Sequence, residues 1–216
     1  MKRRLIWTPA NFISMTLLAV VSMGIAQEDM WTPRADMPTA RLGLSRTVVN
    51  GKIYAIGGYD GTQVLSTVEA YNPATDTWER RTDMLTPRAW LAASAVNGKI
   101  YAIGGWSAAD KEYSIVEAYD SETDTWESRA DMPTPRQGLS TAVVDGRTYV
   151  MEGVNLIGAF LTVEAYNPAS NTWERRMDMP MLRVFLSSGA VNGKIYAIGG
   201  VATVSPPQNL PSGPFA

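Results

Sequence analysis

Four arginines recur along the chain at an almost constant interval and are the first candidates for binding chemistry. They are Arg41, Arg88, Arg136 and Arg183, spaced 47, 48 and 47 residues apart. A guanidinium group offers a planar fork of donors that matches a carboxylate, so arginines gathered near one axis could bind an anionic ligand. They could equally be structural, bound to backbone carbonyls or to four aspartates that keep the same interval: Asp36, Asp83, Asp131 and Asp178.

Glu152 is the one candidate for a catalytic acid or base. It stands where the corresponding parts of the chain have Gly57 and Gly104. A partly buried carboxyl there would have a raised pKa, and Arg136 is the neighbouring cation that could assist it. No second carboxylate is visibly placed to share proton transfer, so a neutral change in a degenerate repeat is the favoured interpretation.

The composition removes most other catalytic chemistry. The 216 residues include no Cys and no His. A disulfide framework, a Cys nucleophile, a Ser-His-Asp triad and a His-ligated metal site are therefore all excluded. No glycine-rich segment precedes a helix, so a phosphate-binding loop is not expected either. We expect no cofactor, no metal and no enzymatic activity.

Aromatic side chains stand at positions that vary between the repeated parts of the chain. Trp90 and Phe185 follow the recurring arginines at a place where Gly43 and Gly138 stand elsewhere. Tyr59 and Trp106 lie in a second variable stretch. Exposed aromatic rings stack on sugars or hold peptides, so these four residues, with the four arginines, are the predicted ligand-binding set.

The elements that position these residues repeat about every 47 residues. Trp31, Trp78, Trp126 and Trp173 share one register, and Tyr54, Tyr101, Tyr149 and Tyr196 share another. Within a unit, Asn50-Gly51 separates two β-like runs, which is the strongest short signal for a hairpin. Two further short strands follow, and each unit is predicted to be a four-stranded antiparallel meander. The recurring Trp and Tyr side chains are expected to pack between stacked meanders.

The units run over residues 41–87, 88–135 and 136–182, and a partial unit covers 183–200. The partial unit lacks its third strand, and we expect an N-terminal strand at residues 31–38 to close it. Residues 201–216 form a proline-rich tail. This count leaves three alternatives: a four-bladed ring, part of a ring completed by a second chain as a homodimer, or a truncated copy of a longer protein.

The first 26 residues are typical of a secretory signal. Lys2, Arg3 and Arg4 precede an apolar stretch at 12–21, and small residues stand at Gly24 and Ala26. The remaining chain, 27–200 with its tail, has 16 basic and 21 acidic residues and a net charge of −5. We expect a secreted or periplasmic protein with no membrane span after cleavage and no nucleic-acid partner.

The pattern resembles the kelch repeat: a Gly-Gly pair, a Tyr ending the third strand and a Trp seven residues later. The matching residues are Gly57-Gly58, Tyr71 and Trp78; Gly104-Gly105, Tyr119 and Trp126; and Gly153, Tyr166 and Trp173. The resemblance is to exported, bacterial-type members and implies an all-β propeller of four-stranded blades, about four in number with the last incomplete.

The resemblance implies a module that binds a protein, peptide or glycan through its variable loops. Exported kelch proteins also include sugar mutarotases, so a metal-free sugar isomerase or epimerase is the alternative. The copper-dependent kelch oxidases need His ligands and a Cys-linked Tyr, and this chain has neither His nor Cys.

Overall fold

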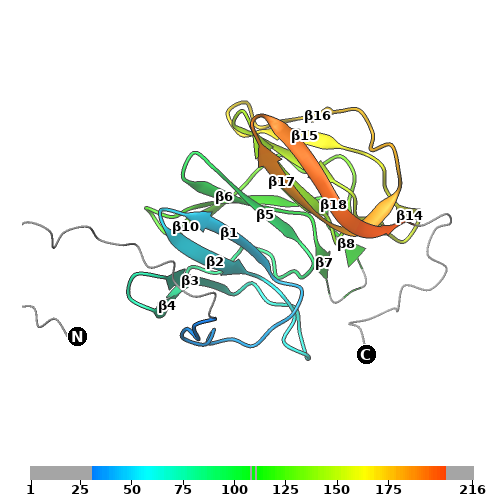
Figure 1. Ribbon diagram of the computed structural model, residues 1–216. Helices are drawn as coiled ribbons and strands as arrows, with labels where there is room; N and C mark the ends of the chain where they lie inside the picture. Colours follow the sequence, from blue (N-terminus) through cyan, green and yellow to red (C-terminus); the bar gives the residue numbers. More distant parts are fainter. Residues whose placement is uncertain (1–30, 108, 110, 203–216) are drawn as a thin grey trace, which may run out of the picture. The chain divides into compact units, whose positions relative to one another are not determined.

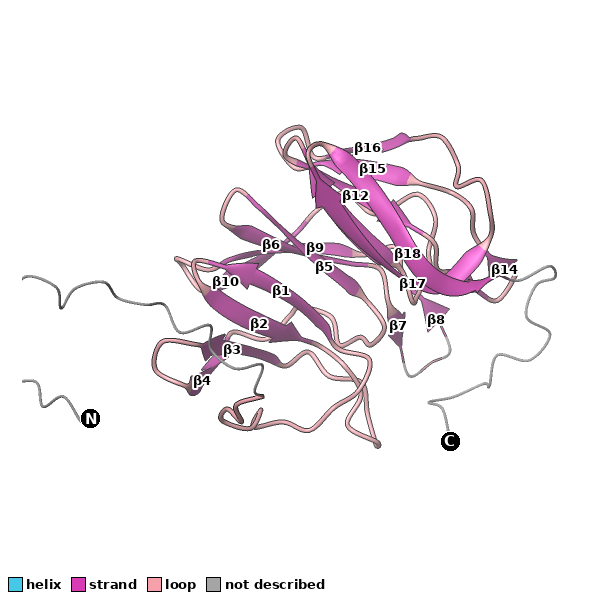
Figure 2. Cartoon of the chain, viewed as in Figure 1, coloured by secondary structure: helices cyan, strands magenta, loops and turns pink. Residues whose placement is uncertain are grey.

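The computed structural model describes residues 31–107, 109 and 111–202. The chain divides into two compact units, 1–34 and 35–216, and the fold belongs to the second. Its described residues form eighteen strands and no helix (Figures 1 and 2). The predicted signal segment, 1–26, and most of the predicted tail lie outside the described residues.

Three four-stranded antiparallel sheets, called blades 1 to 3, follow one another along the chain. Blade 1 consists of β1 (Ser45–Val49), β2 (Lys52–Ile56), β3 (Val68–Asn72) and β4 (Thr77–Arg81). Blade 2 consists of β5 (Ala92–Val96), β6 (Lys99–Ile103), β9 (Val116–Asp120) and β10 (Thr125–Ser128). Blade 3 consists of β11 (Ser140–Val144), β12 (Arg147–Met151), β15 (Glu164–Asn167) and β16 (Thr172–Arg175). The predicted meander is confirmed in each.

The hairpin turns have the backbone that the sequence predicts. Asn50 and Gly51 have φ of 49° and 73°, and Asn97 and Gly98 have φ of 51° and 78°. Two consecutive left-handed residues match the right-handed twist of the flanking strands, and Asn and Gly adopt that conformation at the lowest cost. The same register, from Ser45↔Ile56 to Val49↔Lys52, recurs in the other blades.

Each blade buries its apolar faces against its sequence neighbours. One core cluster joins Tyr54 and Ile56 of blade 1 to Ile100 and Tyr119 of blade 2. A second cluster joins Tyr101 and Ile103 of blade 2 to Val150 and Tyr166 of blade 3. The ring centroids of Tyr54 and Tyr119 lie 5.8 Å apart, and those of Tyr101 and Tyr166 lie 5.5 Å apart. The recurring tyrosines of strand two are thus packing residues in the first two blades, as predicted.

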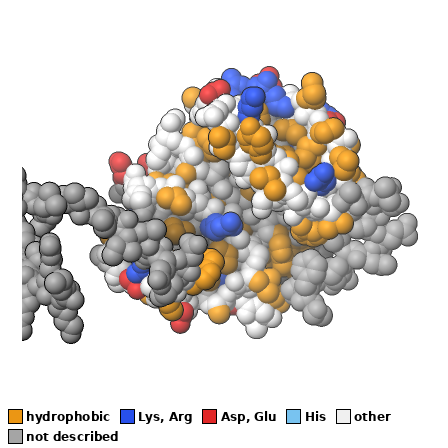
Figure 3. All heavy atoms as spheres, viewed as in Figure 1, with side chains coloured by type: hydrophobic (Ala, Val, Ile, Leu, Met, Phe, Trp, Pro, Cys, Tyr) orange, Lys and Arg blue, Asp and Glu red, His pale blue; other side chains and the backbone are white. Residues whose placement is uncertain are grey.

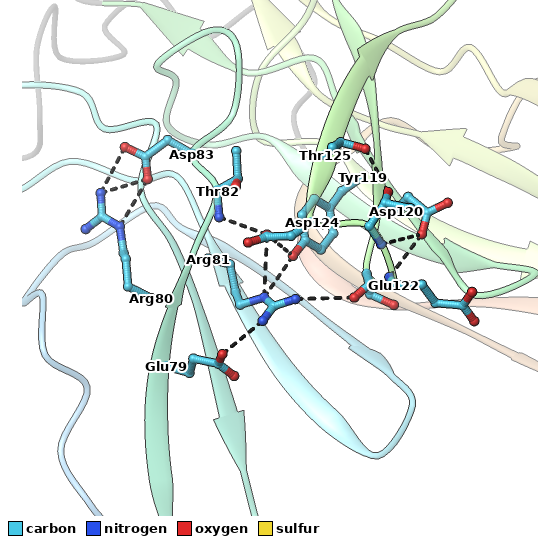
Figure 4. A network of polar contacts seen from close by, with 12 residues as sticks. Glu79, Arg80, Arg81, Thr82, Asp83, Tyr119, Asp120, Glu122, Asp124 and Thr125 are labelled. Atoms are coloured by element: carbon cyan, nitrogen blue, oxygen red, sulfur yellow. Dashed lines mark hydrogen bonds and ion pairs between the residues drawn. The ribbon is translucent and has the colours of Figure 1, made fainter.

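A repeated set of hydrogen bonds, here called the blade latch, fastens a linker to the blade that follows it; Figure 4 shows the part of one latch around Thr82 and Asp124. Between blades 1 and 2, the Thr82 N–H donates to Asp124 Oδ1 at 3.0 Å, and Trp126 Nε1 donates to the Thr82 carbonyl at 2.9 Å. The Tyr119 hydroxyl also donates to Asp124, at 2.6 Å. Ala130 forms the same two bonds with Asn171 and Trp173 in blade 3. Trp78, Trp126 and Trp173 are therefore structural, whereas Trp31 is fully exposed.

Two long strands, β17 (Arg183–Val191) and β18 (Lys194–Ala202), form a two-stranded sheet, here called the terminal hairpin. It packs on blade 3 through β11, but no substantial packing links it to blade 1 among the described elements. A small cluster with Met151 and Leu186 fills this contact.

The predicted closing strand is not found. Residues 31–38 have no strand assignment, and β17 and β18 pair only with each other among the described strands. Ala35 instead forms the blade latch of blade 1, with its N–H on Asp76 and its carbonyl bound by Trp78. The segment that was expected to complete the terminal hairpin is thus fastened to blade 1.

No described part of the chain forms a helix long and apolar enough to cross a bilayer.

Candidate functional site: the loop face

The variable loops and the linkers between blades lie at one end of the sheets, here called the loop face. Isolated bridges pair each linker with the segment after strand two: Leu42↔Tyr59, Ala89↔Trp106 and Gln137↔Val154. The loops of blades 2 and 3 form small hairpins of their own, β7 (Trp106–Ser107) with β8 (Lys111–Glu112), and β13 (Val154–Asn155) with β14 (Gly158–Ala159). The loop face is therefore held by backbone pairing.

Three of the four recurring arginines are buried in ion pairs. Arg88 bonds Glu117 at 3.1 Å, Arg136 bonds Glu164 at 2.6 Å, and Arg41 bonds Glu69 at 3.0 Å, with all three arginine side chains inaccessible to solvent. They also donate to backbone carbonyls: Arg88 binds those of Ala102, Gly104 and Ile115, Arg136 those of Glu152 and Thr162, and Arg41 that of Ala55. Burial lowers the pKa of Arg88 and Arg136, and attraction to the paired glutamates opposes this.

Of the two kinds of structural partner expected for these arginines, the backbone carbonyls are found and the aspartates are not. Asp83 and Asp178 bond nearby Arg80 and Arg175, and Asp131 accepts a hydrogen bond from Ser114. The true partners are the glutamates of the recurring Glu-Ala-Tyr sequence on strand three: Glu69, Glu117 and Glu164. That recurrence could have identified them. Arg183, in the terminal hairpin, has no such strand and donates to the Gly199 carbonyl at 2.8 Å.

Glu152 lies between blade 3 and the terminal hairpin. Its side chain is buried, and its Oε2 accepts the Leu186 N–H at 3.0 Å. Burial raises its pKa to about 7, while the bond from Leu186 lowers it. Its φ of 54° matches the left-handed backbone of Gly57 and Gly104 at equivalent positions. Arg136, the proposed catalytic neighbour, bonds the Glu152 backbone carbonyl and directs its charge at Glu164.

Trp90 and Phe185 occupy a strained backbone position on the loop face. Their φ angles are 51° and 59°, whereas Gly43 and Gly138 adopt 61° at equivalent positions. A left-handed conformation costs a non-glycine residue about 1–2 kcal/mol. The Trp90 ring lies over Gly43, where an added Cβ would come within 3.0 Å of Trp90 Cε2. An aromatic ring in one blade is thus accommodated by a glycine in the preceding one.

The other two aromatic residues of the predicted ligand-binding set are less accessible to a ligand. Trp106 is buried and packs edge-on against Trp90, with ring centroids 5.4 Å apart. Tyr59 is half-buried, and its hydroxyl donates to the Gly61 carbonyl at 2.9 Å. Next to it, Asp60 accepts N–H bonds from Thr62 and Gln63, which lower its pKa to about 2. Asp60-Gly61 is therefore part of a turn.

Sequence reasoning missed the most exposed apolar residues of the loop face. Leu156 and Ile157 form the tip of the β13–β14 hairpin, with 83% and 82% of their surfaces exposed. Asn155 Oδ1 accepts the Ile157 N–H at 2.9 Å and holds the turn. The sequence Asn-Leu-Ile-Gly has no counterpart in the other units, so the repeat comparison gave no signal for it.

Within the described ranges, no three acidic side chains are grouped in a way that could hold a metal ion.

Successive four-stranded sheets joined through latched linkers define a β-propeller architecture. The Kelch motif matches residues 40–85, 87–133 and 135–180, so the chain belongs to the Kelch-motif family. Propellers of this family are generally interaction modules rather than enzymes.

Two known proteins show the extent of the similarity. The human influenza virus NS1A-binding protein is 49% identical over 43 residues, which are 20% of this chain and 7% of that protein. The solved structure of YjhT superposes with a TM-score of 0.70 at 18% identity, covering 79% of this chain and 63% of YjhT. The chain thus spans less than two thirds of either relative, and YjhT supports the fold alone.

Proposed function

We propose that this chain is an extracytoplasmic interaction module that binds a protein or peptide through the apolar tip of its loop face. The main support for this proposal is that Leu156 and Ile157 are exposed at the tip of the β13–β14 hairpin. This hairpin is itself held to the linker by the Gln137↔Val154 bridge. Side chains held rigidly in solvent lose little conformational entropy when a partner covers them. The sequence at 1–26 supports export.

The strained aromatics support the same surface. Phe185 is 53% exposed and Trp90 is half-buried, and both are kept at a backbone position that glycine fills elsewhere without strain. Strain of this kind is concentrated at binding sites. Aliphatic tip residues favour a protein or peptide, because sugar rings are bound mainly by aromatic faces.

The enzymatic alternative is supported only by the raised pKa of Glu152. Glu152 is 1% exposed, and its carboxylate accepts a hydrogen bond from the Leu186 N–H. A general acid must reach the proton that it transfers, so this burial argues against proton transfer to a sugar.

The test selects peptides from a random displayed library on the immobilised chain and titrates them against variants. We expect the Leu156→Ser/Ile157→Ser double variant to weaken binding at least about tenfold, since two exposed anchors are worth over 1.4 kcal/mol. Ala169→Ser, in a turn of the same blade at the opposite end, is the control and should leave affinity unchanged.

A glycan array probed with the same variants separates the two ligand classes. Binding of a glycan that is lost in Trp90→Ala and Phe185→Ala but kept in the tip variant would contradict the protein-binding proposal. It would assign the loop face to sugars instead.

A further inference from the structure

The terminal hairpin exposes the apolar face that the first two blades bury. We call Val191, Tyr196 and Ile198 the terminal face; their exposed fractions are 57%, 48% and 65%. The equivalent residues of blade 1, Val49, Tyr54 and Ile56, are at most 4% exposed, and so are those of blade 2: Val96, Tyr101 and Ile103. Figure 3 shows hydrophobic side chains gathered over this hairpin. The prediction that Tyr196 packs between blades is therefore wrong within this chain.

Blade 1 exposes the complementary surface on its other side. We call Val48 and Ile53 the leading face; they are 60% and 37% exposed. The equivalent of Ile53 in blade 2 is Ile100, which is fully buried against blade 1 in the first core cluster. The leading face thus corresponds to the surface with which blade 2 packs against blade 1.

The leading face already carries part of a blade interface. Ala35 bonds Asp76 and Trp78 in the same way that Thr82 bonds Asp124 and Trp126 between blades 1 and 2. The outer side of the surface is therefore latched as it is within the propeller, and Val48 on β1 and Ile53 on β2 are its exposed apolar residues.

We propose that the terminal face of one copy packs on the leading face of a second copy, head to tail. The occupant is a second copy because this chain carries both halves of an interface that it uses internally between blades 1 and 2 and between blades 2 and 3. The contact is heterologous, so each copy has one of each face.

The test measures the molar mass of the purified chain by light scattering over a range of concentrations. We expect association beyond the monomer, and we expect Ile198→Lys and Val48→Lys each to raise the apparent dissociation constant at least tenfold. Leu85→Lys, at an exposed linker leucine outside both faces, is the matched control and should associate like the parent chain. Circular dichroism verifies that each variant is folded.

Mixing the two variants gives the decisive result. In a head-to-tail contact, the intact terminal face of Val48→Lys fits the intact leading face of Ile198→Lys, so the mixture forms a 1:1 complex that neither variant forms alone. A parent chain that stays monomeric overturns the proposal. So does self-association of Val48→Lys at parental strength, because the hairpins would then be pairing with each other. If Ile198→Lys fails to fold, the self-association of Val48→Lys, which changes the other face, still tests the proposal.

Discussion

At the scale of single residues, the recurring arginines act as internal braces. Each of the three buried guanidinium groups binds a strand-three glutamate and one to three backbone carbonyls in the protein interior. Removing one member of a buried ion pair leaves the other charged and unpaired, which costs far more than the pair contributes. The pairs therefore hold the loop face in place and are not available to bind a ligand.

We expect Arg88→Met to lower the free energy of unfolding by about 3–5 kcal/mol, because Glu117 is left as an unpaired buried charge. The double variant Arg88→Met/Glu117→Leu should recover most of that loss. Urea denaturation monitored by circular dichroism measures both. Arg183→Met is the control. Because Arg183 donates to the Gly199 carbonyl and has no glutamate partner in the described part of the chain, this substitution should lower the free energy of unfolding by less than about 1 kcal/mol. If Arg88→Met and Arg183→Met lowered the free energy of unfolding equally, the structural role assigned to Arg88 would be contradicted.

Glu152 should make the chain more stable as the pH falls from 8 toward 5. Its folded pKa of about 7 lies above the ordinary carboxyl value, so the folded state favours the protonated form. The penalty for ionisation is absent below about pH 4.5, grows between 4.5 and 7, and is complete above pH 7, where it reaches at most about 3 kcal/mol.

Glu152→Gln removes this titration, and its amide oxygen can still accept the Leu186 N–H. The measurement is the melting temperature of both proteins from pH 5 to 8. We expect the melting temperature of the variant to gain on that of the parent as the pH rises from 5 to 7, and the gain to stay constant above pH 7. A constant difference across that range would show that the carboxyl is not held protonated.

At the scale of elements, the blade latch explains how consecutive sheets keep their order. One side chain at the start of strand four accepts the linker N–H and a Tyr hydroxyl, while the Trp indole binds the linker carbonyl. Asp fills this position in blades 1 and 2 and Asn in blade 3, always with a left-handed backbone. Because Asn also adopts that conformation readily, it can perform the same task.

We therefore expect Asp124→Ala to destabilise the chain by about 1–3 kcal/mol, through lost acceptors and backbone strain. Asp124→Asn should cost less than half as much, since Asn171 accepts the same bonds in blade 3. Thermal unfolding compares the two. If both variants lose the same amount, the charge of Asp124 matters more than its geometry.

At the scale of the whole molecule, stability is distributed unevenly along the chain. Blade 2 is covered on both faces, whereas the terminal hairpin is covered on one and exposes almost all of β18. Local opening is easiest where few apolar contacts must be broken. We expect amides of residues 183–202 to exchange with deuterium at least about tenfold faster than those of β5 and β6 at low protein concentration. Equal protection would mean that the hairpin is covered.

The repeat made the blades, their turns and their boundaries predictable, because hairpin chemistry such as Asn50-Gly51 is local. The glutamate partners of the arginines were harder to predict from the sequence. Glu117 has the pattern of an ordinary strand residue, and its role is clear only when the fold brings Arg88 next to strand three. The tip at Leu156 has no repeated counterpart to compare with. The course of residues 31–38 depended on whether Ala35 reached blade 1 or the terminal hairpin, which strand propensity does not decide.

The blade latches also determine how the chain would respond to mechanical tension. Every latch joins a linker to the blade that directly follows it, and none bridges distant blades among the described residues. A pull on the two ends is therefore carried through the blades in series, and each blade resists separately. The hairpin at 183–202, which is braced on one side, would peel away first at low force, and the blades would then extend one at a time as discrete steps.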